Sequence, residues 1–351
     1  MKKIAYIELD THAEIAGNFM DLMQDSNEFS VDYYFSEKIS KQIDPQESNI
    51  FLSDSSKIFR QLKEKNYDLV IIGTAHRYFD VFLKITEYFN TAVIVHNLNF
   101  TKISRFQLFK NIFKKDLKYR LKLLLKEGLF YAPKVFEKAS NLLVLDESLI
   151  KIKPDLSLKF LPVFYTKFIT KPENKIFTIV IPGAVSQKRR DYFSVISKLF
   201  NQPLGRRIKL ILLGKAKGEE LFLLKDAEKK IFGNISMQYF TEKIPQPIFD
   251  EWMQNADILW CPLQKETEFF SQKEFYGVTK MSGNVGDAIK YGKSAIFPEN
   301  FPNSHPFIIR ETATIEEQIL VFQQAKIYDF KDHFAKEKVL KSLEKTLVEL
   351  L

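Results

Sequence analysis

Residues 274–298 read EFYGVTKMSGNVGDAIKYGKSAIFP and hold four glycines, in a chain that has only 12 glycines among 351 residues. The order of residue types predicts a glycine-rich loop, a short helix and a buried strand closed by Pro298. Glycines let the backbone come close to a ligand, and a helix N-terminus presents unpaired N–H groups and a partial positive charge. Lys280, Ser282 and Gly283 lie at that helix start. The stretch therefore predicts a phosphate-binding site, with a structural turn as the alternative.

The overall composition bounds the class of protein. The length predicts two domains of ordinary size, and the apolar and charged fractions of 45% and 27% are typical of a globular protein. The single cysteine, Cys261, lies in the apolar run LWCPL and fits a reducing, cytoplasmic compartment. The net charge of +8 is unevenly spread, which indicates an anionic partner.

The first hundred residues alternate between apolar strands and helical segments. Strands are expected at residues 2–9, 30–35, 67–73 and 91–96, and helices at residues 15–24, 54–65 and 78–89. Such alternation predicts right-handed βαβ units and an open parallel sheet, covered by helices on both faces. A second series of strands and helices restarts at residue 176, so the fold class expected is α/β with two doubly wound, Rossmann-like domains.

Three histidines follow the strands of the first half. His12 comes just after the first strand, His76 just after the third, and His96 ends the fourth. Ligands bind beyond the carboxyl ends of parallel strands, so these positions suit a crevice site. We take His12, Glu14, His76 and His96 as candidate general bases; the alternative for any single histidine is a structural role.

Residues 100–136 differ from the rest of the chain. Lysine and arginine alternate there with Phe, Ile and Leu, and the only acids are Asp116 and Glu127. On helices this pattern gives an apolar face beside a basic one, which is typical of binding to an anionic membrane surface. The alternative is an ordinary packed helix pair with a solvated basic face. Nucleic acid is the third reading, and the chain contains no recognised nucleic-acid motif, so we expect no nucleic-acid partner.

The second half opens with a strand at residues 176–181, a turn at Gly183 and a cationic run that includes Lys188 and Arg189. Cations at the start of a helix are poorly placed for the helix dipole unless an anion neutralises them. A pyrophosphate would do so; the alternative is a solvent-exposed charge run.

The order of elements resembles that of GT-B glycosyltransferases, and the motifs of the second half resemble the "glycosyl transferases group 1" family. The resemblance implies two domains facing a central cleft: 1–168, binding the acceptor, and 176–330, binding a nucleotide sugar. It also implies that residues 331–351 form a helix that crosses back to the first domain.

The resemblance assigns roles in the second half by position. Gly183 forms the turn, and Lys188 or Arg189 holds the donor diphosphate, as do Lys280, Ser282 and Gly283. Glu274 and Asp287 take the positions of the two acidic residues that bind the donor sugar and ribose. The two acids stand further apart here than in the family, and the second is Asp rather than Glu.

The resemblance implies transfer of a sugar from a nucleotide-diphosphate sugar to a glycan or lipid-linked acceptor. The pathway implied is surface polysaccharide or lipopolysaccharide synthesis, at the inner face of the cell membrane. No aspartate-rich metal motif is present, so we expect neither a metal nor any cofactor besides the sugar donor. The alternatives are a nucleotide-sugar epimerase on the same fold and a catalytically degenerate, membrane-peripheral binding protein. Retaining and inverting stereochemistry both remain open.

Overall fold

The computed structural model describes the chain except for residues 44–48, 169–174, 201–204, 232, 303–304 and 327. The chain forms two compact units that interleave in sequence. The first unit comprises Met1–Phe164, Glu268–Met281 and Lys336–Leu351, and the second comprises Tyr165–Thr267 and Ser282–Ala335. The expected domains 1–168 and 176–330 contain most of these two units, but 268–281 lies in the first unit and was expected in the second.

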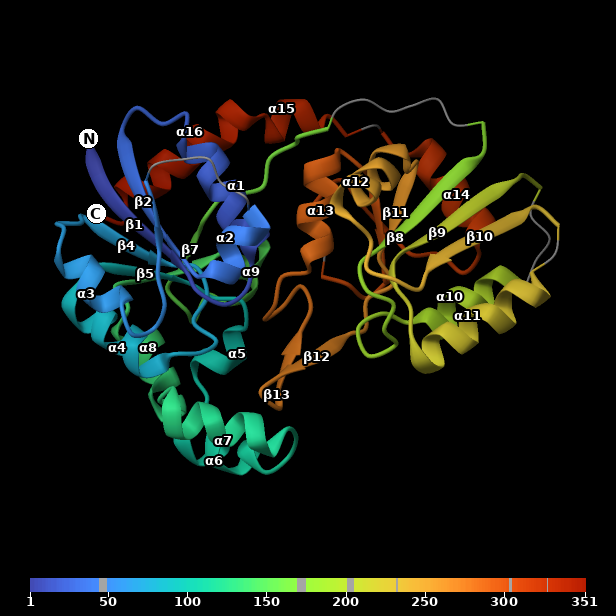
Figure 1. Ribbon diagram of the computed structural model, residues 1–351. Coiled ribbons are helices and arrows are strands. Elements are labelled where there is room, and N and C mark those ends of the chain that lie inside the picture. Colours follow the sequence, from blue (N-terminus) through green and yellow to red (C-terminus); the bar gives the residue numbers. More distant parts are fainter. Residues whose placement is uncertain (44–48, 169–174, 201–204, 232, 303–304, 327) are drawn as a thin grey trace. The chain divides into compact units, whose positions relative to one another are not determined.

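The first unit is built on a seven-stranded parallel sheet in the order β3-β2-β1-β4-β5-β6-β7. Its strands are β1 (Lys2–Glu8), β2 (Phe29–Phe35), β3 (Ile50–Leu52), β4 (Leu69–Ile72), β5 (Thr91–Ile94), β6 (Asn141–Val144) and β7 (Leu158–Phe160). Four consecutive residues of β1, from Ile4 to Ile7, are fully buried. A continuous apolar strand of this kind requires cover on both faces, and helices provide it on either side of the sheet (Figure 1).

The helices of the first unit follow the alternation predicted from the sequence. They are α1 (Ala13–Met23), α2 (Glu37–Ile43), α3 (Ile58–Lys63), α4 (Phe79–Tyr88), α5 (Leu98–Thr101), α6 (Arg105–Ile112), α7 (Leu117–Lys126), the 3-10 turn η1 (Leu129–Tyr131), α8 (Ala132–Lys138), α9 (Ser148–Ile152) and α16 (Lys336–Val348). Lys336 of α16 forms ion pairs with Asp21 at 3.1 Å and Asp25 at 2.7 Å. The expected return of the C-terminal helix to the first unit is therefore confirmed.

A hairpin that arrives late in the sequence also belongs to the first unit. It consists of β12 (Glu266–Phe269) and β13 (Gln272–Phe275), and we call residues 268–281 the strap. The strap lies beside α5, α6 and α7 (Figure 1). Its turn residues, Phe270 and Ser271, have positive φ angles of 50° and 57°. Such strained angles persist because the buried Arg120 donates to Ser271 Oγ at 2.9 Å and lies over the Phe270 ring.

The second unit repeats the topology with six parallel strands in the order β10-β9-β8-β11-β14-β15. The strands are β8 (Phe177–Pro182), β9 (Ile208–Lys215), β10 (Ile235–Phe240), β11 (Ile258–Trp260), β14 (Ala295–Phe297) and β15 (Ile308–Arg310). The helices are α10 (Tyr192–Phe200), α11 (Gly218–Lys230), α12 (Gln246–Asn255), α13 (Gly283–Tyr291), α14 (Ile315–Gln324) and α15 (Phe330–Phe334). The expected loop, helix and strand of residues 274–298 are confirmed as the turn before α13, then α13 and β14.

Strand order places a reversal point in each sheet. The chain winds outward from β1 through β2 to β3, then returns to the other side of β1 with β4. The second sheet reverses in the same way between β8 and β11. In doubly wound sheets the ligand crevice opens beyond the carboxyl ends of the strands at this point. The loops after β1, β4, β8 and β11 are therefore where functional side chains should be sought.

Two glycines offer a matched test of this packing. A Cβ at Gly214, in β9, would lie 2.1 Å from the backbone oxygen of Gly183, whereas one at Gly17, in α1, would meet nothing closer than 4.0 Å. We expect Gly214→Ala to destabilise the protein by about 2 kcal/mol or more, because backbone must move. Gly17→Ala should instead stabilise it by about 0.5–1 kcal/mol, since alanine favours a helix interior. Urea unfolding of both variants measures the difference; equal effects would contradict this account.

Candidate functional site

The three histidines meet at the carboxyl edge of the first sheet. His12 follows β1 in a left-handed conformation, with φ of 63°. Its ring stacks on that of His96, with centroids 3.9 Å apart, and lies 6.0 Å from that of His76. The structure thus brings together the three histidines that the sequence places at strand ends. We call His12, His76 and His96 the histidine cluster.

A chain of hydrogen bonds joins the histidine cluster to the strap. Lys280 Nζ donates to Asn97 Oδ1 at 2.7 Å, and Asn97 Nδ2 lies 3.0 Å from His76 Nε2. His96 Nε2 lies 2.9 Å from the carbonyl oxygen of Gly73. Phe269 of the strap packs on the His76 ring at 4.4 Å. The second half of the sequence therefore supplies part of a site in the first unit.

The surroundings of the histidine cluster favour neutral imidazoles. Burial and the positive charge of Lys280 lower the pKa of His12 to about 4. Part of His12 is exposed to solvent, and the burial is that of the ring face covered by His96. Burial, His12 and Lys280 lower the pKa of His76 to about 3, and burial with the neighbouring histidines also lowers that of His96. The rings are thus available as hydrogen-bond donors and acceptors at neutral pH rather than as cations.

A buried carboxyl lies beneath the cluster. Glu8 is only 1% exposed, and burial raises its pKa to about 7, although it accepts hydrogen bonds from Thr74 Oγ1 and from the amides of Asp10 and Thr11. Its Oε2 is so close to Gly73 that a Cβ there would lie 2.7 Å away. Glu8 could not be identified from the sequence, because nothing in the apolar strand shows that its last residue turns inward.

Two of the acids named from the sequence, Glu14 and Glu274, belong to the first unit. Glu14 is exposed in the first turn of α1. Glu274 is fully buried in β13, where its carboxylate accepts from the backbone amides of Asn99 and Phe100 at the start of α5. These bonds tie the strap to the first unit.

The second unit carries a separate polar network where β8 ends and α13 begins. Arg190 is buried and donates from Nη2 to Asn284 Oδ1 at 3.2 Å, and Asn284 Nδ2 donates to Asp287 Oδ2 at 3.0 Å. Gly183 has a φ of 97°, and a Cβ there would lie 2.5 Å from Arg190 Nη2. Ser282 caps α13 by accepting from the Asn284 amide. The network thus places a guanidinium and a carboxylate at a helix start.

Arg190 is distinct from its two cationic neighbours. Lys188 and Arg189 are exposed, whereas Arg190 is 8% exposed, and its Nε is one of the buried polar atoms without a hydrogen-bond partner among the described residues. Gly283, at the start of α13, has open space where a side chain would be. Lys188 and Arg189 were the cations expected to bind phosphate, and Arg190 was missed because the sequence does not show which residue of a cationic run is buried.

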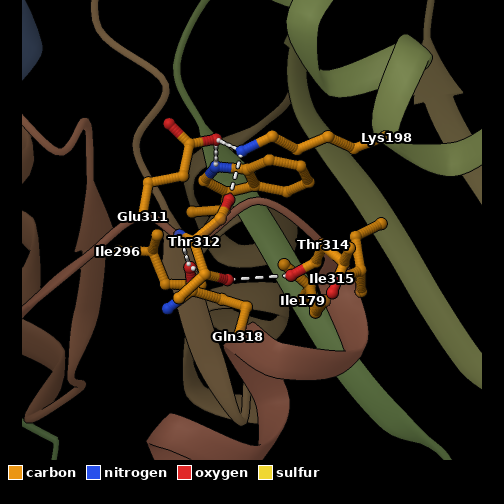
Figure 2. Close-up of a pocket in the computed structure, with 9 residues that line it drawn as sticks. Ile179, Lys198, Ile296, Glu311, Thr312, Thr314, Ile315 and Gln318 are labelled. Atoms are coloured by element: carbon orange, nitrogen blue, oxygen red, sulfur yellow. Dashed lines mark hydrogen bonds and ion pairs between the residues drawn. The ribbon is translucent and has the colours of Figure 1, made fainter. Parts of the chain in front are cut away.

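A small pocket lies elsewhere in the second unit, between α10, α14 and the sheet (Figure 2). Lys198 Nζ binds Glu311 Oε1 at 2.8 Å and the carbonyl oxygen of Thr312 at 2.6 Å, and Trp260 Nε1 donates to the same carboxylate. Its volume of about 10 Å³ is room for roughly one water molecule. The pocket is therefore a packing feature rather than a nucleotide site.

Two negative findings concern the part of the chain that the structure describes. None of its helices has the combination of length and apolar character that crossing a bilayer requires. Nor do its described His, Cys, Asp and Glu side chains form a group of three or more placed to hold a metal ion.

No family model and no curated protein matches the sequence. Solved structures match the fold along the whole chain. The lipopolysaccharide outer core galactosyltransferase WaaB, in its apo form, shares 13% identity at a TM-score of 0.60, covering 99% of this chain and 100% of its own. HepE of Anabaena in complex with UDP shares 11% at a TM-score of 0.62, with the same coverage.

The UDP-GlcNAc 2-epimerase of Neisseria meningitidis, bound to UDP-GlcNAc, is also similar, with 10% identity, a TM-score of 0.54, and coverage of 99% of this chain and 100% of its own. At such identities these likenesses show the fold, which is that of the GT-B structures. The fold expected from the sequence is thereby confirmed.

The pKa of Glu8 leads to a test. A carboxyl whose folded pKa is raised stabilises the protein fully below its unfolded pKa, near 4.5, and loses that contribution as pH rises through about 7. Glu8→Gln stays uncharged and keeps a carbonyl for the two amides. The unfolding free energy of wild type relative to Glu8→Gln should therefore fall by on the order of 1–3 kcal/mol between pH 5 and pH 8.

Denaturant titrations at both pH values measure this change, and Glu28→Gln, at an exposed position, is the control. Histidine titration is common to both proteins and cancels in the difference. Curves for wild type and Glu8→Gln that stay parallel from pH 5 to pH 8 would show that Glu8 is charged throughout.

Proposed function

We propose that the chain is a glycosyltransferase that takes its sugar from a nucleotide-diphosphate donor. The observation that carries the proposal is the buried Arg190 guanidinium beside the N-terminus of α13. A buried cation is costly unless an anion compensates it, and Arg190 donates to the carbonyl oxygen of Ala184 and to Asn284 Oδ1, both of which are neutral. A diphosphate would supply the negative charge.

The chemistry of sugar transfer fits this arrangement. The leaving group is a nucleoside diphosphate, and its developing charge is best stabilised by fixed donors. Arg190 offers a planar guanidinium, and α13 offers amides at Ser282 and Gly283 with the positive end of its dipole. Lys188 and Arg189, exposed beside this position, are proposed to add long-range attraction for the donor.

Asp287 is proposed to bind the donor ribose. It lies at the middle of α13, where it accepts a hydrogen bond from Asn284, and Asn284 in turn accepts one from Arg190. Carboxylate oxygens accept from the two hydroxyls of a diol, and this fits the position that the family resemblance gave to its second acid. For Glu274 and Lys280 we propose roles in the first unit instead, since their hydrogen bonds go to Asn99, Phe100 and Asn97.

The acceptor is proposed to bind at the histidine cluster. An inverting transfer would use a general base there, with His12, Glu14, His76 and His96 as the candidates. Neutral imidazoles suit this task because only a neutral ring accepts a proton. In a retaining transfer the same side chains would hydrogen-bond the acceptor hydroxyl.

We further propose that the acceptor is lipid-linked and that α6 and α7 dock on an anionic, cytoplasmic membrane face. Phe106, Phe113 and Leu125 are 68%, 62% and 78% exposed, although large apolar residues are usually covered. Exposed lysines lie among them. Aromatic and aliphatic side chains beside lysines complement the interface of a bilayer that carries acidic lipids. Synthesis of surface polysaccharide or lipopolysaccharide would supply such acceptors.

Donor binding is the first test. A thermal-shift titration with UDP, GDP, CMP and TDP should show stabilisation by one of them, worth about 2.7 kcal/mol at a hundredfold excess over its Kd. Arg190→Met should weaken that binding by roughly tenfold or more, because a charge-assisted hydrogen bond contributes about 1.5–3 kcal/mol. Asp287→Ala should also weaken it.

Arg206→Met, at an exposed position of the second unit, is the control. Loss of binding in Lys188→Gln or Arg189→Gln, with Arg190→Met unaffected, would move the phosphate contact to the exposed cations. If no nucleotide shifts the melting temperature, a degenerate binding protein becomes the better account. A sugar nucleotide whose sugar epimerises without any acceptor would favour an epimerase.

Membrane docking has its own test. Replacing Lys110, Lys114 and Lys118 with glutamine should weaken binding to phosphatidylserine-containing vesicles by roughly a hundredfold, at about 1 kcal/mol per charge. Lys115 is left in place because it pairs with Glu268 at 2.5 Å. The matched control replaces Lys217, Lys225 and Lys229, which are exposed in or beside α11. Equal vesicle binding by the two triple variants would remove α6 and α7 as the docking surface.

A further inference from the structure

The strap delivers one cation to the histidine cluster, and its backbone is held firmly there. Gly277 donates its amide to the carbonyl oxygen of Lys280 at 2.8 Å, and Phe275 donates to Thr279 Oγ1 at 2.9 Å. The carbonyl oxygen of Thr279 in turn accepts from the Leu98 amide at 2.9 Å. Lys280 is therefore positioned from both sides, by its own turn and by the start of α5.

The contact of Lys280 fixes the orientation of Asn97. An ammonium group has donors and no acceptor, so the Asn97 atom 2.7 Å from Lys280 Nζ must be the carbonyl oxygen. The other end of the Asn97 side chain is then the NH₂ group, and it lies 3.0 Å from His76 Nε2. Because an amide NH₂ only donates, His76 Nε2 must present its lone pair.

The proton of neutral His76 is consequently on Nδ1. His96 has the opposite arrangement, since its Nε2 lies 2.9 Å from the Gly73 carbonyl oxygen, which only accepts. His96 therefore carries its proton on Nε2 and keeps a lone pair on Nδ1. A hydroxyl group that reached both rings would find a donor on His76 and an acceptor on His96.

We propose that Lys280 is a positioning residue of the histidine cluster, which acts through Asn97 to hold the proton of His76 on Nδ1. The position of the His76 proton does not depend on the activity of the protein, whereas its consequence for acceptor hydroxyls rests on the proposed glycosyl transfer. Three charged or titratable groups lie around His76: Lys280 from the strap, His12 after β1 and His96 after β5. Phe269 covers the His76 ring and adds no charge.

Nuclear magnetic resonance of the histidine rings in the ligand-free protein tests this directly. His76→Gln identifies the His76 signals, and long-range ¹H–¹⁵N spectra report which ring nitrogen carries the proton. In wild type at pH 7 the proton should be on Nδ1. In Lys280→Met the ring should become a mixture of tautomers, and its titration midpoint should rise, because a nearby cation is lost.

Two further variants sharpen the result. Lys280→Arg keeps a cationic donor and should retain the Nδ1 proton. Asn97→Asp replaces the donating NH₂ by an accepting oxygen, so His76 should carry its proton on Nε2 or become fully protonated. These variants decide the matter if Lys280→Met does not fold. Lys273→Met, an exposed lysine of the same strap, is the control and should leave the His76 signals unchanged.

A proton on Nε2 of His76 in the wild type, or a Lys280→Met spectrum identical to the wild type, would overturn the proposal. Because the spectra need no substrate, they stand even if the chain transfers no sugar, so the two failures are distinguishable. Where transfer is observed, the acid limb of the pH–rate profile should move to higher pH in Lys280→Met.

Discussion

The buried carboxylate of Glu274 joins two segments of the first unit that lie far apart in the sequence. It accepts from the amides of Asn99 and Phe100, and through them it joins the strap to the start of α5. Without an acceptor there, both amides would lose their partner, at about 1–3 kcal/mol for the buried amide of Phe100. Burial raises the pKa of Glu274, and the hydrogen bonds and Lys280 act in the opposite direction. The position of Lys280 at the histidine cluster follows from this anchoring.

The fold was predictable because its signals are local and repeated. Apolar runs such as residues 67–73 and 176–181 predict strands buried on both faces, and their alternation with helices leaves few topologies. The strap was not predictable, because its alternating polar and apolar letters carry no information about which unit it packs on. Contacts such as Asn111 to the Phe270 carbonyl join residues far apart in sequence, and no periodicity reports them.

The same distinction holds for the candidate site. Strand ends placed His12, His76 and His96 together, since topology alone decides where the carboxyl ends of parallel strands meet. Which of the other polar residues belong to the site depends on which side chains are buried, and burial depends on tertiary packing. Of three consecutive cations, Arg190 turns inward because residue 190 bridges to Leu263 in the loop after β11, and because Gly183 leaves room for its guanidinium. Asn97 and Glu8 could not be recognised from the sequence, because their roles depend on contacts with residues that are distant in sequence, such as Lys280 for Asn97 and Thr74 for Glu8.

The interleaved sequence of the two units has a consequence for biosynthesis. The first unit needs the strap and α16, whose Glu344 accepts from the Ser26 hydroxyl near the end of α1. The strap leaves the ribosome only after residues 165–267 of the second unit have been made, and α16 only after all of that unit. The nascent first sheet therefore exposes part of its apolar surface throughout that interval, which makes it a natural client for chaperones. Lys280, which contacts the histidine cluster through Asn97, is likewise made long after the three histidines, so no fragment that ends before residue 280 contains it.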